Sequence, residues 1–158
     1  MTFNQVAVSA LVAQLESTAM TLNVFRSVNF HEPKSAPGTG LRLAIWCQSL
    51  EPIAFASGLA STSGYVVCWA RVYGNMLAKP EDETDPRIMT AMTTLIGAYS
   101  ADFTLGGTIR NLDLLGAYGE KLAAQAGYVT IDSHLYRQMT LTVPCIVDDM
   151  WTQEASDQ

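Results

Sequence analysis

The sequence predicts an α+β fold in which a mostly antiparallel sheet carries two helices on one face, in the order α-β-β-α-β-β-β. Two segments have apolar residues every three or four positions, which is the period of a helix, and the other apolar segments alternate as strands do. At 158 residues the chain has the usual size of one domain, and it contains no internal repeat or linker. We therefore expect a single domain over residues 1–151 and a short polar tail over 152–158.

The first helix is expected over residues 3–26. Its apolar stripe consists of Val8, Leu11, Val12, Leu15, Ala19 and Leu22. Thr2 and Gln5 have the spacing of a capping box, in which each side chain binds the other residue's backbone N–H. A helix that lies on a membrane surface needs Lys or Arg on its polar side, whereas this one offers residues such as Glu16. The helix is therefore expected to pack on protein.

Two strands are expected next, over residues 41–50 and 65–76, with an extended Gly-, Ser- and Ala-rich connection over 51–64 between them. The second strand is apolar or aromatic on both of its faces. One face carries Tyr65, Val67, Trp69, Arg71 and Tyr73, and the other carries Val66, Cys68, Ala70 and Val72. Because two helices cover only one face of such a sheet, we expect the second face to bind a partner, most simply another copy of the chain.

The second helix is expected to follow an acidic turn over residues 79–86 and to run to Ser100. Asp85 has the side chain of a helix cap, and Pro86 suits the first helical position, where no backbone N–H is needed. The apolar stripe of this helix consists of Ile88, Met92, Leu95, Ile96 and Tyr99.

The C-terminal third is expected to be sheet. Residues 107–116 alternate as a strand, and residues 127–131 and 135–147 form a hairpin across the turn 132–134. Pro144 has no N–H to donate to a ladder, so it indicates a sheet edge or the end of the last strand.

The composition favours a subunit of an assembly. Charged residues make up 15% of the chain, against about 25% in typical soluble domains, so much of the surface is weakly polar. The net charge of −6 and the absence of a basic run argue against ordinary nucleic-acid binding. No apolar run reaches the ~20 residues that span a bilayer, and the N-terminal segment lacks the basic region of a signal peptide, so we expect a cytosolic chain without a membrane partner.

Few residues point to catalysis. The three cysteines lie far apart in strand-like segments and are expected to be reduced core thiols. They are Cys47, Cys68 and Cys145. His134 is expected in the hairpin turn, and the neighbours His31 and Glu32 form a His–Glu pair that is weak evidence for a site. We expect no enzyme, no cofactor and no metal; the alternative, a small hydrolase, would need a pocket with a perturbed acid, His or Cys.

Three stretches of the sequence resemble a known family. They are "HEPKSAPGTGLRLAIW", "SGLASTSGYVVCWARVYGNM" and "GGTIRNLDLLGAYGEKLAAQAGYVTIDSHLYRQMTLTVPCIVDDMW". Over roughly residues 25–152 the chain is similar to the tail terminator (tail completion) proteins, which are small structural proteins of long-tailed bacteriophages of actinobacterial hosts. That family has no catalytic residues to carry over.

The resemblance implies a specific structural role. Tail terminators are α+β proteins that form a hexameric ring on the finished tail tube, stop the polymerisation of the tube protein and dock the head-side connector. Genomic DNA passes through the lumen without specific binding. The chain would then lie at the neck of the virion, at the top of the tail, and in the host cytoplasm during assembly. A head–tail stopper or another neck connector ring is the alternative.

In this setting the loop over residues 28–40 is expected to be a binding loop, because Pro33 and Pro37 limit the entropy that it loses on docking. The candidate assembly-interface residues are His31, Glu32, Lys34, Trp46, Tyr65, Trp69, Arg71, Tyr73 and Trp151. For each aromatic residue the alternative is an ordinary place in the core.

Overall fold

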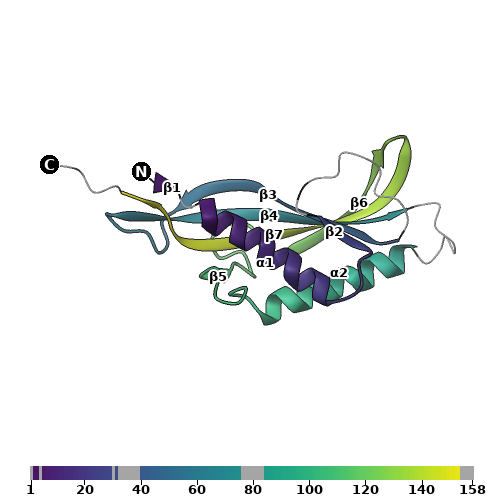
Figure 1. Cartoon of the computed structure of the whole chain (residues 1–158), viewed down its shortest axis with the longest axis horizontal. Coiled ribbons are helices and arrows are strands. Elements are labelled where there is room, and N and C mark those ends of the chain that lie inside the picture. The colour runs from purple at the N-terminus through teal and green to yellow at the C-terminus, as the bar shows by residue number, and fades with distance from the viewer. Residues whose placement is uncertain (1, 4, 30, 32–39, 76–83, 154–158) are drawn as a thin grey trace.

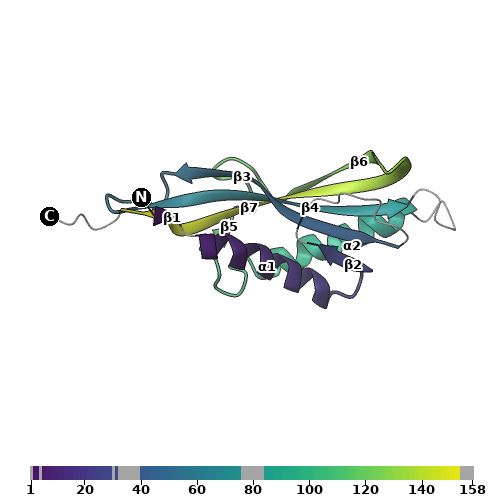
Figure 2. The same cartoon turned by 45° about the horizontal axis from the view of Figure 1, so that its top comes forward.

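A computed structural model of the chain confirms the α+β fold class and the expected order of the main elements. One mixed, mostly antiparallel sheet contains the strands in the order β1-β7-β4-β3-β2, and β5 and β6 also pair with β7. Both helices lie on the same face of this sheet (Figures 1 and 2). The structure describes residues 2–3, 5–29, 31, 40–75 and 84–153.

The sheet is built on three long strands that run the length of the molecule (Figure 1). The elements are β1 (Thr2–Phe3), α1 (Gln5–Thr21), β2 (Ser27–Asn29), β3 (Arg42–Ile53), β4 (Ser61–Asn75), α2 (Thr84–Ala101), β5 (Asn111–Leu112), β6 (Ala123–Ile131) and β7 (His134–Thr152). All pairings are antiparallel except that of β2 with β3. The short strands β1 and β2 were not expected, because two or three residues are too few to show a period.

Helix α1 is shorter than the expected 3–26. It ends at Thr21 because the chain turns there: the N–H of Asn23 binds the Met20 carbonyl oxygen at 3.3 Å, and Asn23 has a left-handed φ of 57°. The expected capping box is wrong, since Thr2 pairs with Thr152 in β1 and the helix begins only at Gln5.

Half of the connection expected over 51–64 is strand. β3 continues to Ile53 and β4 begins at Ser61, so only 54–60 forms the turn. Gly64 serves packing here, because a Cβ at this position would lie 3.0 Å from Cγ of Met150. A Gly- and Ser-rich sequence therefore marks a close approach of β4 and β7 rather than a linker.

The prediction of a strand over 107–116 is wrong except for the two residues of β5, Asn111–Leu112. The backbone has positive φ at Leu105, Gly106, Gly107 and Gly116, which bends the chain on both sides of β5.

β7 does not end at Pro144 but continues to Thr152, one residue into the expected tail. The Pro144 carbonyl oxygen accepts the Asp113 N–H at 2.9 Å. Because the N–H and C=O positions of one strand residue face the same edge, the missing N–H of Pro144 also faces this side. Pro144 lies between the first residue pair of β6, Ala123–Thr142, and the last residue pair of β5, Leu112–Cys145. Pro144 therefore occupies a local edge of the sheet, which was one of the two positions expected for it, and not the end of the last strand.

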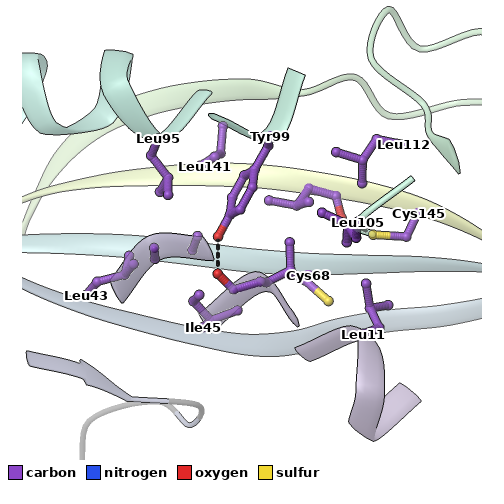
Figure 3. Close-up of a cluster of buried hydrophobic side chains, with 14 of the residues drawn as sticks. Leu11, Leu43, Ile45, Cys68, Leu95, Tyr99, Leu105, Leu112, Leu141 and Cys145 are labelled. Carbon is purple, nitrogen blue, oxygen red and sulfur yellow. Dashed lines mark hydrogen bonds between the residues drawn. The ribbon is translucent and has the colours of Figure 1, made fainter. Parts of the chain in front are cut away.

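The main core lies between the helices and the sheet (Figure 3). Its fully buried members include Leu11, Leu15, Leu43, Ile45, Cys68, Leu95, Tyr99, Leu105, Leu141 and Cys145. Tyr99 of α2 donates its hydroxyl hydrogen to the Leu15 carbonyl oxygen of α1 at 2.8 Å, so one buried polar contact joins the two helices.

Candidate assembly interface

β4 separates two different environments, as its alternation predicted. Val66, Cys68, Ala70 and Val72 belong to the main core under the helices. Tyr65, Val67 and Tyr73, which alternate with these residues, belong to two smaller buried clusters on the other face of the sheet. The first contains Ala44, Tyr73 and Tyr136, and the second contains Tyr65, Val67 and Ile146. We call this side of the sheet the second face.

Two tryptophans and an arginine meet on the second face. Trp46 of β3 and Trp69 of β4 are direct cross-strand partners, with ring centroids 6.2 Å apart and ring planes at 68°. The guanidinium carbon of Arg71 lies 5.5 Å from the Trp46 ring centroid and 5.7 Å from that of Trp69. All three side chains are partly exposed. We call these residues the Trp–Arg cluster, and its cation–π contacts hold one charge between two large apolar surfaces.

Hydrogen bonds fix the position of the arginine. Arg71 Nε donates to Thr140 Oγ1 at 2.7 Å, and the Thr140 hydroxyl donates to Gln138 Oε1 at 2.8 Å. Trp46 Nε1 donates to Gln48 Oε1 at 3.1 Å. These bonds hold the cluster in one orientation, and a surface that is ordered in this way loses less entropy if it binds.

A hollow of about 220 Å³ opens beside the cluster. Its lining consists of Trp69, Arg71, Gln125, Ala126, Gln138, Thr140 and Thr142. The sequence did not single out the glutamines and threonines, which come from β6 and β7. Their contribution depends on the register that places Thr140 opposite Arg71 and Gln125 opposite Thr140, and alternation alone does not give a register.

Tyr65 lies in the core of the single chain, which was the alternative to an interface position. It is 2% exposed, and its hydroxyl oxygen lies 2.7 Å from Asp113 Oδ2 and 2.8 Å from the Glu120 carbonyl oxygen. The Asp113 carboxylate also accepts the N–H groups of Ala117 and Tyr118, at 2.8 and 2.9 Å. The chain's own loop between β5 and β6 therefore covers this end of the second face. Burial and the contact with Asp113 raise the pKa of Tyr65 above its ordinary value.

Tyr73 also occupies a core position in the single chain, as the same alternative predicts. It is 1% exposed and packs edge-to-face on Tyr136, with ring centroids 6.4 Å apart. Trp151 lies away from the Trp–Arg cluster, because it packs partly against the main core. His31 is exposed, and Glu32 and Lys34 lie outside the described residues. Among the described candidates, the structure thus brings together Trp46, Trp69 and Arg71 as a partly exposed group. The buried cluster of Tyr73 packs against Trp46, and that of Tyr65 packs against Trp69.

A second exposed apolar group lies at one end of the molecule. Phe55, in the β3–β4 turn, stacks on Tyr118 with ring centroids 4.7 Å apart, and Arg110 lies 5.4 Å over the Phe55 ring. Leu59 and Leu115, in the same two loops, are 103% and 92% exposed. This group has no signal in the sequence, because single apolar residues in loops have no periodicity.

The cysteines and His134 were the other residues considered for a catalytic or metal site. Cys68 and Cys145 are buried, and contact with Cys145 raises the pKa of the Cys68 thiol, whereas Cys47 is exposed, contrary to expectation. His134 Nδ1 lies 2.8 Å from the Asp132 carbonyl oxygen in the hairpin turn. Within the described ranges no three His, Cys, Asp or Glu side chains are placed to hold a metal ion. No helix in the described part of the chain is long and apolar enough to span a membrane.

Comparison with known proteins gives no family for the chain. No model of a known protein family matches it, and no curated protein matches it.

Proposed function

We propose that the chain is a structural virion protein, a phage tail terminator that forms a hexameric ring at the end of the tail tube. The single observation that carries the proposal is the Trp–Arg cluster on the second face of the sheet. Trp and Arg are the residue types that most often anchor protein–protein contacts. Their fixed geometry on a face without helices supports a surface that another protein covers.

Two further features support an assembly role. The chain has few charged residues, and large apolar side chains are exposed at the loop tips around Phe55 and Leu115. A ring needs two different complementary surfaces on each subunit, and a terminator also needs contacts to the tube and to the connector. The resemblance over residues 25–152 supplies the particular role: the ring stops tube polymerisation, docks the head-side connector and lets DNA pass through its lumen.

Electron microscopy of virions labelled with an antibody against the chain tests this role. We expect one band of label where the tube meets the neck, on a six-fold ring in contact with the last tube layer. Label one layer nearer the capsid would make the chain a stopper or another neck connector. Intact particles that carry no label, and in which mass spectrometry does not detect the chain, would contradict a virion role.

A further inference from the structure

The outer edges of β3 and β6 differ in how they are protected. β2 covers β3 only at Arg42–Ala44, so most of the outer edge of β3 lacks a strand partner among the described residues. That edge is protected, because β3 contains a bulge between Cys47 and Ser49 and a proline at Pro52. Bulges and prolines are the devices by which edge strands resist the addition of another strand.

β6 has none of these devices. Its nine residues, AAQAGYVTI, include no charged residue and no proline, and its register with β7 runs without a shift. Within the described chain it pairs only with β7, so its other edge has no strand beside it. The β6–β7 hairpin also curls away from the helices at one end of the molecule, which leaves that edge open (Figure 1).

The hydrogen-bonding groups on this open edge can be assigned. The carbonyl oxygens of Pro144 and Ile146 accept N–H groups from Asp113 and Arg110, so even-numbered residues of β7 face the β5–β6 side. Their partners in β6 are odd-numbered, which leaves the even-numbered residues of β6 facing outward. The outward-facing residues are Ala124, Ala126, Tyr128 and Thr130.

We propose that this edge binds the β6 strand of a second copy of the chain, antiparallel and centred on Gly127. The first argument is shape. Of the four outward-facing residues, the two before Gly127 are small and the two after it are larger, so two-fold pairing sets Ala126 opposite Tyr128 and Ala124 opposite Thr130. All four outward-facing residues of each copy then form backbone hydrogen bonds.

The second argument is charge. Each copy carries a net charge of −6, and repulsion between two copies is smallest where both contribute an uncharged surface. The nine residues of β6 carry no charge, and the charge that lies over Tyr128, that of Arg137, is opposite in sign to the net charge of the chain. The pairing concerns the free chain and does not depend on a role in the tail.

Residue-resolved amide hydrogen exchange of the full chain, at concentrations below and above its dimerisation, tests the pairing. We expect the N–H groups of Ala124, Ala126, Tyr128 and Thr130 to exchange rapidly in the dilute monomer and at least about tenfold more slowly in the dimer. A chain that stays monomeric at every concentration would overturn the inference. So would an oligomer in which these four amides still exchange as fast as in the monomer. A cyclic hexamer with unprotected β6 amides would overturn the pairing alone and leave the proposed ring intact.

A matched pair of variants gives a second test. Ala126→Lys places a charge beside the two-fold axis and is expected to weaken dimerisation by about tenfold or more. Ala54→Lys makes the same change at an exposed turn position outside β6 and is expected to leave dimerisation unchanged. Equal dimerisation of both variants, each with the circular dichroism of the wild type, would contradict the pairing.

Discussion

The two faces of one sheet differ in what covers them. Under the helices, β4 contributes Val66, Cys68 and Ala70 to a large continuous core. On the second face, the same strand contributes to two small buried clusters at its ends and to the partly exposed Trp–Arg cluster between them. One face of this strand therefore belongs to the main core, whereas the middle of the other carries the partly exposed cluster that we propose for assembly.

The sharpest stability contrast lies between neighbours in β7. Leu141 is fully buried under the helices, so Leu141→Ala is expected to lower the free energy of unfolding by about 2–5 kcal/mol. Thr142 lines the hollow on the second face, and Thr142→Ala should cost no more than about 1 kcal/mol. Urea denaturation of both variants measures the difference. Equal losses would mean that the two faces contribute alike to the fold.

The buried end of the second face should behave as core. Tyr65→Phe removes the hydroxyl that contacts the Asp113 carboxylate and is expected to lower the free energy of unfolding by about 1–3 kcal/mol. The change should leave assembly intact in folded chains. Normal stability with lost assembly would return Tyr65 to the interface.

Alkaline pH should weaken both buried tyrosine contacts. Burial raises the pKa of Tyr99 and of Tyr65 above the ordinary value of about 10. The folded state therefore holds these protons more tightly than the unfolded state, so the stabilisation is complete below pH ~10 and is lost as the pH rises above it.

Denaturation at pH 8 and pH 11 measures this loss. Tyr99→Phe removes the hydrogen bond to the Leu15 carbonyl oxygen, costs about 1 kcal/mol at pH 8 and should make the fall in stability with pH shallower. An unchanged fall in this variant would show that Tyr99 does not titrate differently in the folded state.

A small effect on stability and the largest effect on assembly are expected at Arg71. Arg71→Gln removes the charge between Trp46 and Trp69 and the Nε hydrogen bond to Thr140, which together are worth about 1–2 kcal/mol to the fold. Co-assembly with tube protein, followed by sedimentation, should nevertheless be lost. Arg87→Gln is the control, because that arginine is exposed on α2, on the face of the sheet opposite the cluster. Assembly of Arg71→Gln at the wild-type level would exclude the cluster from the interface.

The sequence predicted the sides of β4 correctly because a period of two determines which residues share a face. It could not say what covers each face. Tyr65 and Trp69 lie on the same face of β4 by their alternation. The loop held by Asp113 covers Tyr65 but leaves Trp69 partly exposed. The meeting of Trp46 with Trp69 depends on a register that shifts just beyond it, at the bulge between Cys47 and Ser49. A bulge of this kind has no signal in the alternation.

The false strand over 107–116 has a different cause. Its sequence alternates well enough, but Gly106, Gly107 and Gly116 have positive φ, and only Asn111–Leu112 remains to pair with β7. Local periodicity was overruled here by the backbone conformation of the flanking residues.

The most direct test of the assembly surface is hydroxyl-radical footprinting of the chain, free in solution and within purified phage tails. We expect Trp46 and Trp69 to be oxidised in the free chain and protected in the tail, whereas Met89, exposed on α2, is oxidised in the free chain and serves as the reference there. Equal oxidation of both tryptophans in the two states would contradict the assignment of the second face as the assembly interface.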